Sequence, residues 1–222
     1  MNIFHIAIDG PVASGKGTIA KGLSERLGIP CLDTGAMYRS IAVYIRDKKL
    51  NFEDEKVVTE ALPKIKMEVE TKKGMTHVHI NGKDVTNKIR DNDISKIASS
   101  IAVYPEVRKF AIAKQQEIAK TESFILEGRD IASAVLTDAK YKFYLTAKLK
   151  TRALRRQADL AEKGIQITLE EMKQQIRTRD RRDMKKGGLK QVKEAFVIDN
   201  TKLTVDETVS EFILHISGFE QG

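Results

Sequence analysis

A glycine-bounded loop near the N-terminus carries residue types that could bind phosphate. The stretch IFHIAIDGPVASGKGTIA (residues 3–20) places two glycines and Lys16 as in the pattern G-x-x-x-x-G-K-[ST]. The next residue is Gly17, so the hydroxyl comes one position late, at Thr18. In such a loop, backbone N–H groups and a helix N-terminus cradle phosphate oxygens while the lysine neutralises their charge. The predicted nucleotide-phosphate site comprises Gly10, Pro11, Val12, Ala13, Ser14, Gly15, Lys16, Gly17 and Thr18.

Short runs of β-branched and aromatic residues alternate with helical patterns along most of the chain. Strands separated by helices are typical of an α/β fold with a mainly parallel sheet, covered by helices on both faces. The expected strands cover residues 3–9, 30–33, 123–128, 142–147 and 195–200. The expected helices cover residues 16–27, 36–48, 106–120, 150–163, 169–184 and 205–217. The loop therefore lies between the first strand and the first helix, the context that a phosphate loop requires.

The rhythm changes between about residues 64 and 88. The stretch IKMEVETKKGMTHVHINGKDV alternates apolar and polar residues, with turn residues at Lys73-Gly74 and Asn81-Gly82. A period of two around such turns predicts β-hairpins. We expect a small antiparallel insert here.

The composition is that of an ordinary globular domain. The chain has 222 residues, of which 41% are hydrophobic and 32% charged, and this length suits one sizeable core. Cys31 is the single cysteine, so no internal disulfide can form and a reducing compartment is expected. The N-terminal apolar run meets Asp9 too early for a signal peptide, and no apolar stretch approaches the length of a membrane span. We expect a cytoplasmic protein without a membrane partner.

Positive charge is concentrated in one quarter of the sequence. The whole chain has a formal charge of +8, whereas residues 140–193 hold 17 lysines and arginines against 6 acidic residues. Such a segment indicates a polyanionic partner, either nucleotide phosphates or nucleic acid. The alternative is a solvated helix face.

Several further motifs follow the loop in order. They are LDTGAMYR (32–39), VHINGKDVT in the insert, ASSIAVYPEVR (98–108), LEGRDIASAV (126–135), RTRDRRD (177–183) and AFVIDNTKLTVDE (195–207). Together with the loop form G-K-G-T, which resembles that of nucleoside monophosphate kinases, this set resembles the bacterial cytidylate kinase family. The resemblance implies transfer of the γ-phosphoryl group of ATP to CMP or dCMP. It also implies Mg²⁺, bound through nucleotide phosphates and water rather than by protein ligands.

The resemblance implies a domain organisation as well. It predicts a single kinase domain on a five-stranded parallel sheet of the P-loop kinase type, acting as a monomer without a stable nucleic-acid partner. The core would comprise residues 1–63, 89–150 and 191–222, the acceptor-nucleotide insert about 64–88, and a helical lid about 151–190.

Phosphoryl transfer to a monophosphate fits these residue types. The acceptor phosphate is already largely dianionic near pH 7, so its oxygen can attack without a general base. The difficulty is electrostatic, because two polyanions must meet in line, and arginine forks with Mg²⁺ serve that need. No catalytic histidine is required. We expect structural or surface roles for His5, His77, His79 and His215.

By resemblance, residues that follow the expected strands bind the acceptor. Arg39 and Arg129 would hold its phosphate, with a surface ion pair as the structural alternative for each. Asp130 would accept a hydrogen bond from the cytosine N4 amine, with Ser99 and Arg108 as its partners. A helix-capping Asp130 is the structural alternative.

The remaining assignments also come from the resemblance. Thr34 would add a hydroxyl near the acceptor, and Asp183 would lie near its ribose with Arg179 assisting. The residues expected to act on the transferring group are Lys16, Arg129 and Arg179. A substrate contact is also assigned to Lys186, where the family pattern has arginine and Gly187-Gly188 follows in place of Ser-Pro. Lysine keeps the charge but loses the bidentate fork.

Two expected helices separated by EKGIQIT carry a cluster of arginines. A helical hairpin of this kind could close over ATP as a lid and exclude water. Helical spacing cannot place all of the arginines on one face, so we expect several of them to be solvated. They are Arg155, Arg156, Arg177, Arg179, Arg181 and Arg182.

Two other functions fit part of the pattern. Another small-molecule kinase, acting on UMP, AMP or shikimate, would share the loop and the sheet. The NGKDVT stretch and the set of Ser99, Arg108 and Asp130 favour cytidine nucleotides. A non-catalytic RNA-binding module would use the basic segment, but the aromatic residues there are few and lie in an expected strand.

Overall fold

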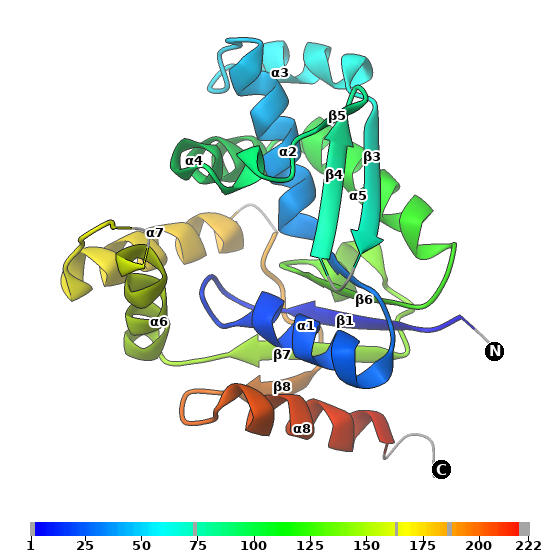
Figure 1. Ribbon diagram of the computed structural model, residues 1–222, viewed down its shortest axis with the longest axis vertical. Helices are drawn as coiled ribbons and strands as arrows, with labels where there is room; N and C mark the ends of the chain where they lie inside the picture. The colour runs from blue at the N-terminus through cyan, green and yellow to red at the C-terminus, as the bar shows by residue number, and fades with distance from the viewer. Residues whose placement is uncertain (1–2, 73–74, 163, 186–187, 218–222) are drawn as a thin grey trace.

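The computed structural model describes residues 3–72, 75–162, 164–185 and 188–217. Its centre is a five-stranded sheet in which every pair is parallel, in the order β2-β6-β1-β7-β8 (Figure 1). The strands are β1 (His5–Asp9), β2 (Cys31–Asp33), β6 (Phe124–Gly128), β7 (Tyr141–Thr146) and β8 (Phe196–Asp199). The predicted α/β class and its five strands are confirmed.

Strand β1 shows how the sheet separates two apolar cores. Ile6 and Ile8 are fully buried among side chains of α1 (Lys16–Leu27) and α8 (Val205–Ser217). Ala7 lies between them in sequence and belongs to the other core, because successive side chains of a strand point to opposite faces. The helices that contribute to that second core are α2 (Thr34–Asp47), α3 (Glu55–Ala61), α4 (Asn92–Ile101) and α5 (Pro105–Ala119).

All six expected helices have ends within two residues of the predicted ones, and the described chain has two further α-helices that the sequence did not predict. Helix α2 begins at Thr34 instead of residue 36, because the Asp33 carboxylate accepts from the Ala36 N–H and caps it. The unpredicted helices are α3 and α4. Three short segments complete the helical elements of the described chain: η1 (Leu62–Lys64), η2 (Lys88–Arg90) and η3 (Ile131–Val135).

The predicted insert is a small antiparallel sheet. Its strands are β3 (Met67–Lys72), β4 (Met75–Ile80) and β5 (Lys83–Asp84). Asn81 and Gly82 join β4 to β5 with φ values of 51° and 74°, so both adopt the left-handed conformation that a tight hairpin turn needs. The other predicted turn, Lys73-Gly74, lies outside the described residues.

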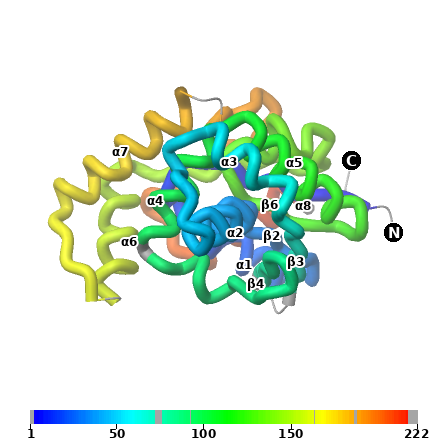
Figure 2. The backbone as a smooth tube through the Cα atoms, turned by 90° about the horizontal axis from the view of Figure 1, so that it is seen from above, coloured from blue at the N-terminus to red at the C-terminus, as the bar shows by residue number. Residues whose placement is uncertain are grey.

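Helices α6 (Leu149–Ala161) and α7 (Leu169–Lys185) form the hairpin predicted for the basic segment. They lie side by side at one end of the molecule, away from both chain ends (Figures 1 and 2). Ala153 of α6 and Met172 and Ile176 of α7 form a small core of their own. None of the described helices is long and apolar enough to cross a membrane.

Candidate active site

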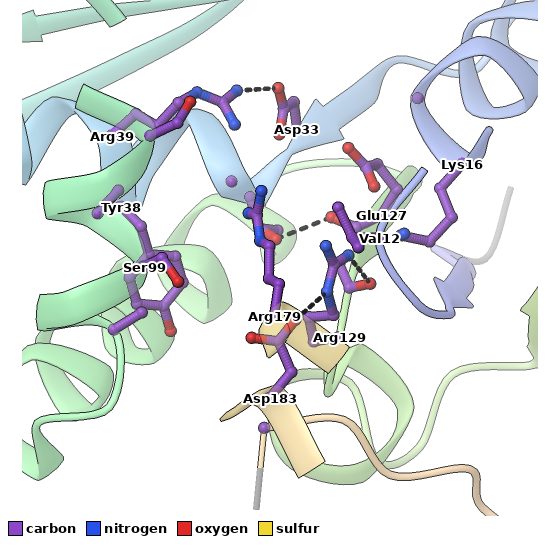
Figure 3. Close-up of a pocket in the computed structure, with 18 of the residues that line it drawn as sticks. Val12, Lys16, Asp33, Tyr38, Arg39, Ser99, Glu127, Arg129, Arg179 and Asp183 are labelled. Atoms are coloured by element: carbon purple, nitrogen blue, oxygen red, sulfur yellow. Dashed lines mark hydrogen bonds and ion pairs between the residues drawn. The ribbon is translucent and has the colours of Figure 1, made fainter. Parts of the chain in front are cut away.

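A pocket of about 390 Å³ opens where strands β1, β2 and β6 end. The carboxyl ends of parallel strands meet at one edge of such a sheet, and ligands bind there. The phosphate loop, the first turn of α2, helices α4 and α5 and the hairpin α6–α7 all contribute to its wall. Residues from very different parts of the sequence therefore face one cavity (Figure 3).

Most of the predicted site residues meet in this pocket. Gly10, Pro11 and Ser14 are buried and do not line it, and Lys186 lies outside the described residues. The predicted residues that line the wall are Val12, Ala13, Gly15, Lys16, Gly17, Thr18, Thr34, Arg39, Ser99, Arg108, Arg129, Asp130, Arg179 and Asp183.

The phosphate loop starts at a position that only glycine can occupy. Gly10 has a φ of 154°, and a Cβ there would lie 2.1 Å from the carbonyl oxygen of Leu145, at the end of β7. Gly15, with a φ of 93°, is the N-cap of α1. The first pattern glycine therefore allows close packing on the sheet, and the second turns the chain into the helix.

Lys16 is 6% exposed, and its ammonium donates to the carbonyl oxygen of Pro11 at 3.0 Å. Burial and the neighbouring Arg129 hold the pKa of Lys16 below its usual value. Burial and the neighbouring Asp33 raise the pKa of Glu127, whose side chain lies near Lys16. An anion in the pocket would stabilise the ammonium form of Lys16.

Arg39 is held by a carboxylate that also caps its own helix. Its Nη2 donates to Asp33 Oδ2 at 2.6 Å, and the other oxygen of Asp33 accepts from the Ala36 N–H (Figure 3). The Asp33 N–H donates to the hydroxyl of Thr76 on β4, so the insert contacts the site. Thr34 is buried, and its hydroxyl donates to the carbonyl oxygen of Glu127 at 2.8 Å.

An ion pair between a half-buried arginine and a buried aspartate lies in the part of the pocket beside α5. Arg108 Nη2 donates to Asp130 Oδ2, and Asp130 is 6% exposed. Burial raises the pKa of Asp130, and the Arg108 guanidinium opposes that shift. Tyr38 also lines the pocket, and burial with the nearby Asp130 raises its pKa. Asp130 does not use its side chain to cap η3, so its carboxylate is directed to Arg108.

Asp9 holds the loop that carries Asp130. The two carboxylate oxygens of Asp9 accept from the N–H groups of Ile131 and Ala132, each at 2.8 Å. Burial raises the pKa of Asp9 to about 6. The last residue of β1 therefore joins the phosphate loop to the Asp130 loop.

Arginines of the hairpin reach the same cavity. Arg129 Nε donates to Asp183 Oδ2 at 2.9 Å, which brings the β6 loop to α7 (Figure 3). Arg179 is half-buried, and its buried Nε has no hydrogen-bond partner among the described residues. Burial and Arg129 lower the pKa of Arg179 to about 10. A guanidinium with this burial and an unused donor fits a site for an anion.

The six arginines of the basic segment separate into distinct groups. Arg156, Arg179 and Arg182 line the pocket, and Arg182 donates to the hydroxyl of Ser99 on α4. Arg155 instead donates to the side chain and carbonyl of Asn200. Arg177 and Arg181 do not line the pocket.

Sequence reasoning missed several acidic residues and their partners. Glu127 could have been found, since it precedes the glycine that ends an expected strand and parallel strands end at the ligand edge. Asp33 stands at the end of β2 in the same way. No sequence signal pointed to the contacts of Asp180 or Arg152, which depend on how α6 and α7 pack.

The arrangement suits a bound polyanion. Lys16, Arg129 and Arg179 converge from three elements, and the described residues contain no group of three or more His, Cys, Asp or Glu side chains able to hold a metal ion. Thr18, Asp33 and Glu127 also line the pocket and offer oxygen ligands of the kind that Mg²⁺ prefers. These oxygens fit a Mg²⁺ that enters with the phosphates.

Comparison with known proteins gives consistent matches. A family profile described as Cytidylate kinase matches residues 6–217. A cytidylate kinase of Shouchella clausii is 39% identical over 212 residues, covering 95% of this chain and 94% of that protein. One of Thermotoga neapolitana is 40% identical over 212 residues, covering 95% of each. A solved gluconokinase of Sinorhizobium meliloti shares the fold, with a TM-score of 0.52 at 12% identity over 98% of this chain and 95% of its own.

Proposed function

The chain belongs to the cytidylate kinase family, and we propose that it transfers the γ-phosphoryl group of ATP to CMP or dCMP in this pocket. One observation carries the assignment of the pocket. The phosphate-loop Lys16 and the Asp130–Arg108 pair line the same cavity, together with Arg39, Arg129 and Arg179.

The phosphate loop binds the donor. Backbone N–H groups at the start of α1 and the positive end of that helix face the phosphates of ATP. Lys16 follows the N-cap Gly15 and neutralises charge on the transferring group. Thr18, Asp33 and Glu127 line the pocket and would hold a Mg²⁺ that enters with the nucleotide, directly or through water. When bound, that ion neutralises phosphate charge.

The opposite part of the pocket binds the acceptor. Arg39 and Arg129 hold its phosphate, and the Asp33 and Asp183 carboxylates orient these two guanidiniums. Asp130 accepts from the cytosine amine, while Arg108 keeps the Asp130 carboxylate ionised and in place. Uracil presents a carbonyl oxygen instead, which the carboxylate repels.

Chemistry then needs positioning and charge neutralisation. The acceptor phosphate supplies its own nucleophilic oxygen, so no side chain has to remove a proton. Arg179 has the one buried guanidinium nitrogen without a hydrogen-bond partner in the described part of the chain. We assign it to the charge that spreads over the transferring group, where a fixed arginine contributes most. Closure of α6–α7 over the nucleotides excludes water.

The test is a phosphorylation screen. The protein is incubated with ATP and Mg²⁺ and each common ribo- and deoxyribonucleoside monophosphate, and ADP release is coupled to NADH oxidation. We expect turnover with CMP or dCMP to exceed that with UMP, AMP and GMP by at least about ten-fold in kcat/KM. Equal or greater turnover with a purine monophosphate would contradict the acceptor assignment.

A monomeric state and a cytoplasmic location stay predictions. Light scattering tests the monomeric state.

A further inference from the structure

Val12, in the middle of the phosphate loop, has both of its backbone polar groups bound by side chains of the helical hairpin. Its N–H donates to Asp180 Oδ1 of α7 at 3.2 Å. Its carbonyl oxygen accepts from Arg152 Nη1 of α6 at 3.0 Å. Among the described residues, Val12 is the only residue of the loop whose backbone groups are bound by side chains of two different helices.

Arg152 and Asp180 are themselves a buried ion pair. Arg152 Nη1 donates to Asp180 Oδ2 at 2.7 Å, and each residue is 8% exposed. Arg152 Nε donates to the carbonyl oxygen of Ala147, directly after β7. The pair is thereby fixed to the sheet as well as to the loop. Neither side chain lines the pocket.

Apolar packing supports the same connection. Val12 and Ala13 pack against the small core that the hairpin forms from Ala153, Met172 and Ile176. Ala13 has a φ of 59°, a left-handed conformation that is uncommon for a residue with a side chain. The surrounding contacts must maintain that conformation, and the apolar packing against the hairpin is one of them.

Helix α7 links the Val12 contacts to the arginines of the pocket. Arg179 precedes Asp180 in sequence, and Asp183, one helical turn later, accepts from Arg129. Holding Asp180 on the loop therefore also sets the distance between Arg179 and whatever phosphate the loop binds. A displacement of about 1 Å in such a group is enough to lower turnover strongly.

We propose that Arg152 and Asp180 are positioning residues for phosphoryl transfer. Through Val12 they join the phosphate loop and the proximal part of the hairpin into one rigid unit, so that Arg179 is already placed against the bound ATP. The hairpin's closure then involves its distal part, around the connection of α6 to α7, and leaves the Val12 contacts in place. The inference rests on the proposed function only in taking the loop as the ATP site.

The alternative is that the pair merely stabilises the fold. Buried ion pairs are weak evidence for stability, since apolar residues of similar volume often replace both partners without loss. Removing one partner alone is costly, because it leaves a buried charge unpaired. A double substitution therefore separates the two roles: it restores a packed interior but leaves the Val12 N–H and carbonyl without partners.

The experiment compares Asp180→Ala, Asp180→Asn and the double variant Arg152→Met/Asp180→Leu with the unchanged protein. Glu170→Gln is the matched control, since Glu170 lies on the same helix and pairs with Lys173 in solvent. Thermal melting measures folding, and steady-state kinetics give kcat, KM for ATP and KM for CMP. Hydrogen exchange without nucleotide follows the amides of residues 12–16, since Pro11 has no N–H.

We expect the double variant to melt within a few degrees of the unchanged protein and to lose about ten-fold or more in kcat. Its KM for ATP should rise about ten-fold, as one to two lost hydrogen bonds would give, with KM for CMP within about three-fold. Asp180→Asn keeps an oxygen for the Val12 N–H, so its KM for ATP should rise less than that of Asp180→Ala. Exchange of the loop amides should be faster in the double variant and unchanged in Glu170→Gln.

Other results overturn the inference. A folded double variant with the original kcat and KM for ATP would show that the contacts only stabilise the fold. An equal rise in both KM values would point to general loosening. Failure of the acceptor assignment is distinguishable, because the unchanged protein would then lack CMP turnover. ATP binding by calorimetry and loop exchange would still decide the inference in that case, and an unaltered loop in the double variant would reject it.

Discussion

Arg129 and Asp183 are joined by a hydrogen bond of 2.9 Å between Nε and Oδ2, although 54 residues separate them in the chain. Arg129 follows strand β6, next to the central strand β1, and Asp183 lies on the last turns of α7. The fork nitrogens of Arg129 are left to the pocket, except that Nη1 also contacts the carbonyl oxygen of Gly128 at 3.3 Å. The carboxylate thus orients the guanidinium while leaving part of it for an anion.

Replacing Asp183 should therefore impair the use of the acceptor phosphate. Asp183→Ala frees Arg129 to rotate, and we expect kcat/KM for CMP to fall by about ten- to a hundred-fold. Asp183→Asn retains an oxygen that accepts from Nε, so its loss should be smaller. Glu117→Gln, at an exposed ion pair on α5, is the control. Equal loss in the Ala and Asn variants would show that Asp183 acts through its charge or through direct substrate contact instead.

The second prediction concerns the phosphate loop itself. Lys16→Ala should remove most turnover, at least about a hundred-fold in kcat, because it deletes the charge closest to the transferring group. The fold should persist, since the substitution also removes a buried ammonium that burial disfavours. Circular dichroism and melting check the fold. A folded variant with kcat near that of the unchanged protein would reject the loop as the ATP site.

Asp130 provides a test of base recognition. The unchanged protein should prefer CMP over UMP by about ten- to a hundred-fold in kcat/KM, which corresponds to about 1–3 kcal/mol for one misread base edge. Asp130→Ala should lower CMP turnover and shrink that preference, because the repulsion of uracil is lost along with the attraction of cytosine. The values of kcat/KM for CMP and for UMP are measured with the unchanged protein and with Asp130→Ala. A preference unchanged by the substitution would move base recognition to other residues.

The raised pKa of Asp9 predicts a dependence of stability on pH. Its pKa of about 6 exceeds the ordinary value of 3.8, so the folded state binds the proton more tightly than the unfolded state. The contribution is fully present below about pH 4 and is lost as the pH rises through about 6, on the order of 3 kcal/mol. Denaturant unfolding from pH 4 to 7 should show this slope in the unchanged protein relative to Asp9→Asn.

Asp84→Asn supplies a control of opposite sign. Hydrogen bonds from Thr86 hold the pKa of Asp84 below its ordinary value, so its contribution is present above that value and is lost on acidification. The two variants should therefore diverge from the unchanged protein in opposite directions as the pH changes. If the free energies of unfolding of both variants ran parallel to that of the unchanged protein across the pH range, neither Asp9 nor Asp84 would have a shifted pKa in the folded state.

The last prediction concerns the hairpin without and with nucleotides. Like charges on α6 and α7 repel one another until phosphates arrive, so protection of residues 150–185 against hydrogen exchange should rise when ATP and CMP analogues bind. The rise should be largest toward the α6–α7 connection and smallest near Arg152 and Asp180. Identical protection in both states would reject closure linked to binding.

Local sequence signals were sufficient for the sheet and for the loop. The run Phe124–Gly128 is apolar, β-rich and bounded by a glycine, and it is the strand expected there. The carboxyl-end rule then brings Lys16, Arg129 and Asp130 to one pocket. The sequence does not predict helix α4, whose last residues 98–101 belong to the motif that leads into the next helix; its N-cap Asp91 makes no side-chain capping hydrogen bond.

Contacts that depend on packing could not be predicted in this way. Val12 and Asp180 are 168 residues apart, and neither residue type indicates the other. For Arg39 the sequence suggested a phosphate contact or an ion pair, but it did not indicate that the partner is Asp33, across the first turn of α2. The resemblance supplied roles for arginines, whereas the carboxylates that orient them became visible only in three dimensions.

The strand order has a consequence for the newly made chain. Strand β1 leaves the ribosome before the other strands of its sheet, yet its two neighbours are β6 and β7, whose pairing with it starts at Phe124 and Tyr141. At about 5–20 residues per second, both edges of β1 stay unpaired for on the order of ten seconds during translation. The apolar stretch Ile6–Ile8 is exposed for that time, and an unpaired apolar strand is a site for aggregation. Chaperone binding during synthesis should therefore concentrate on the segment around Ile6–Ile8. It should decrease once β7 has emerged and can pair with β1.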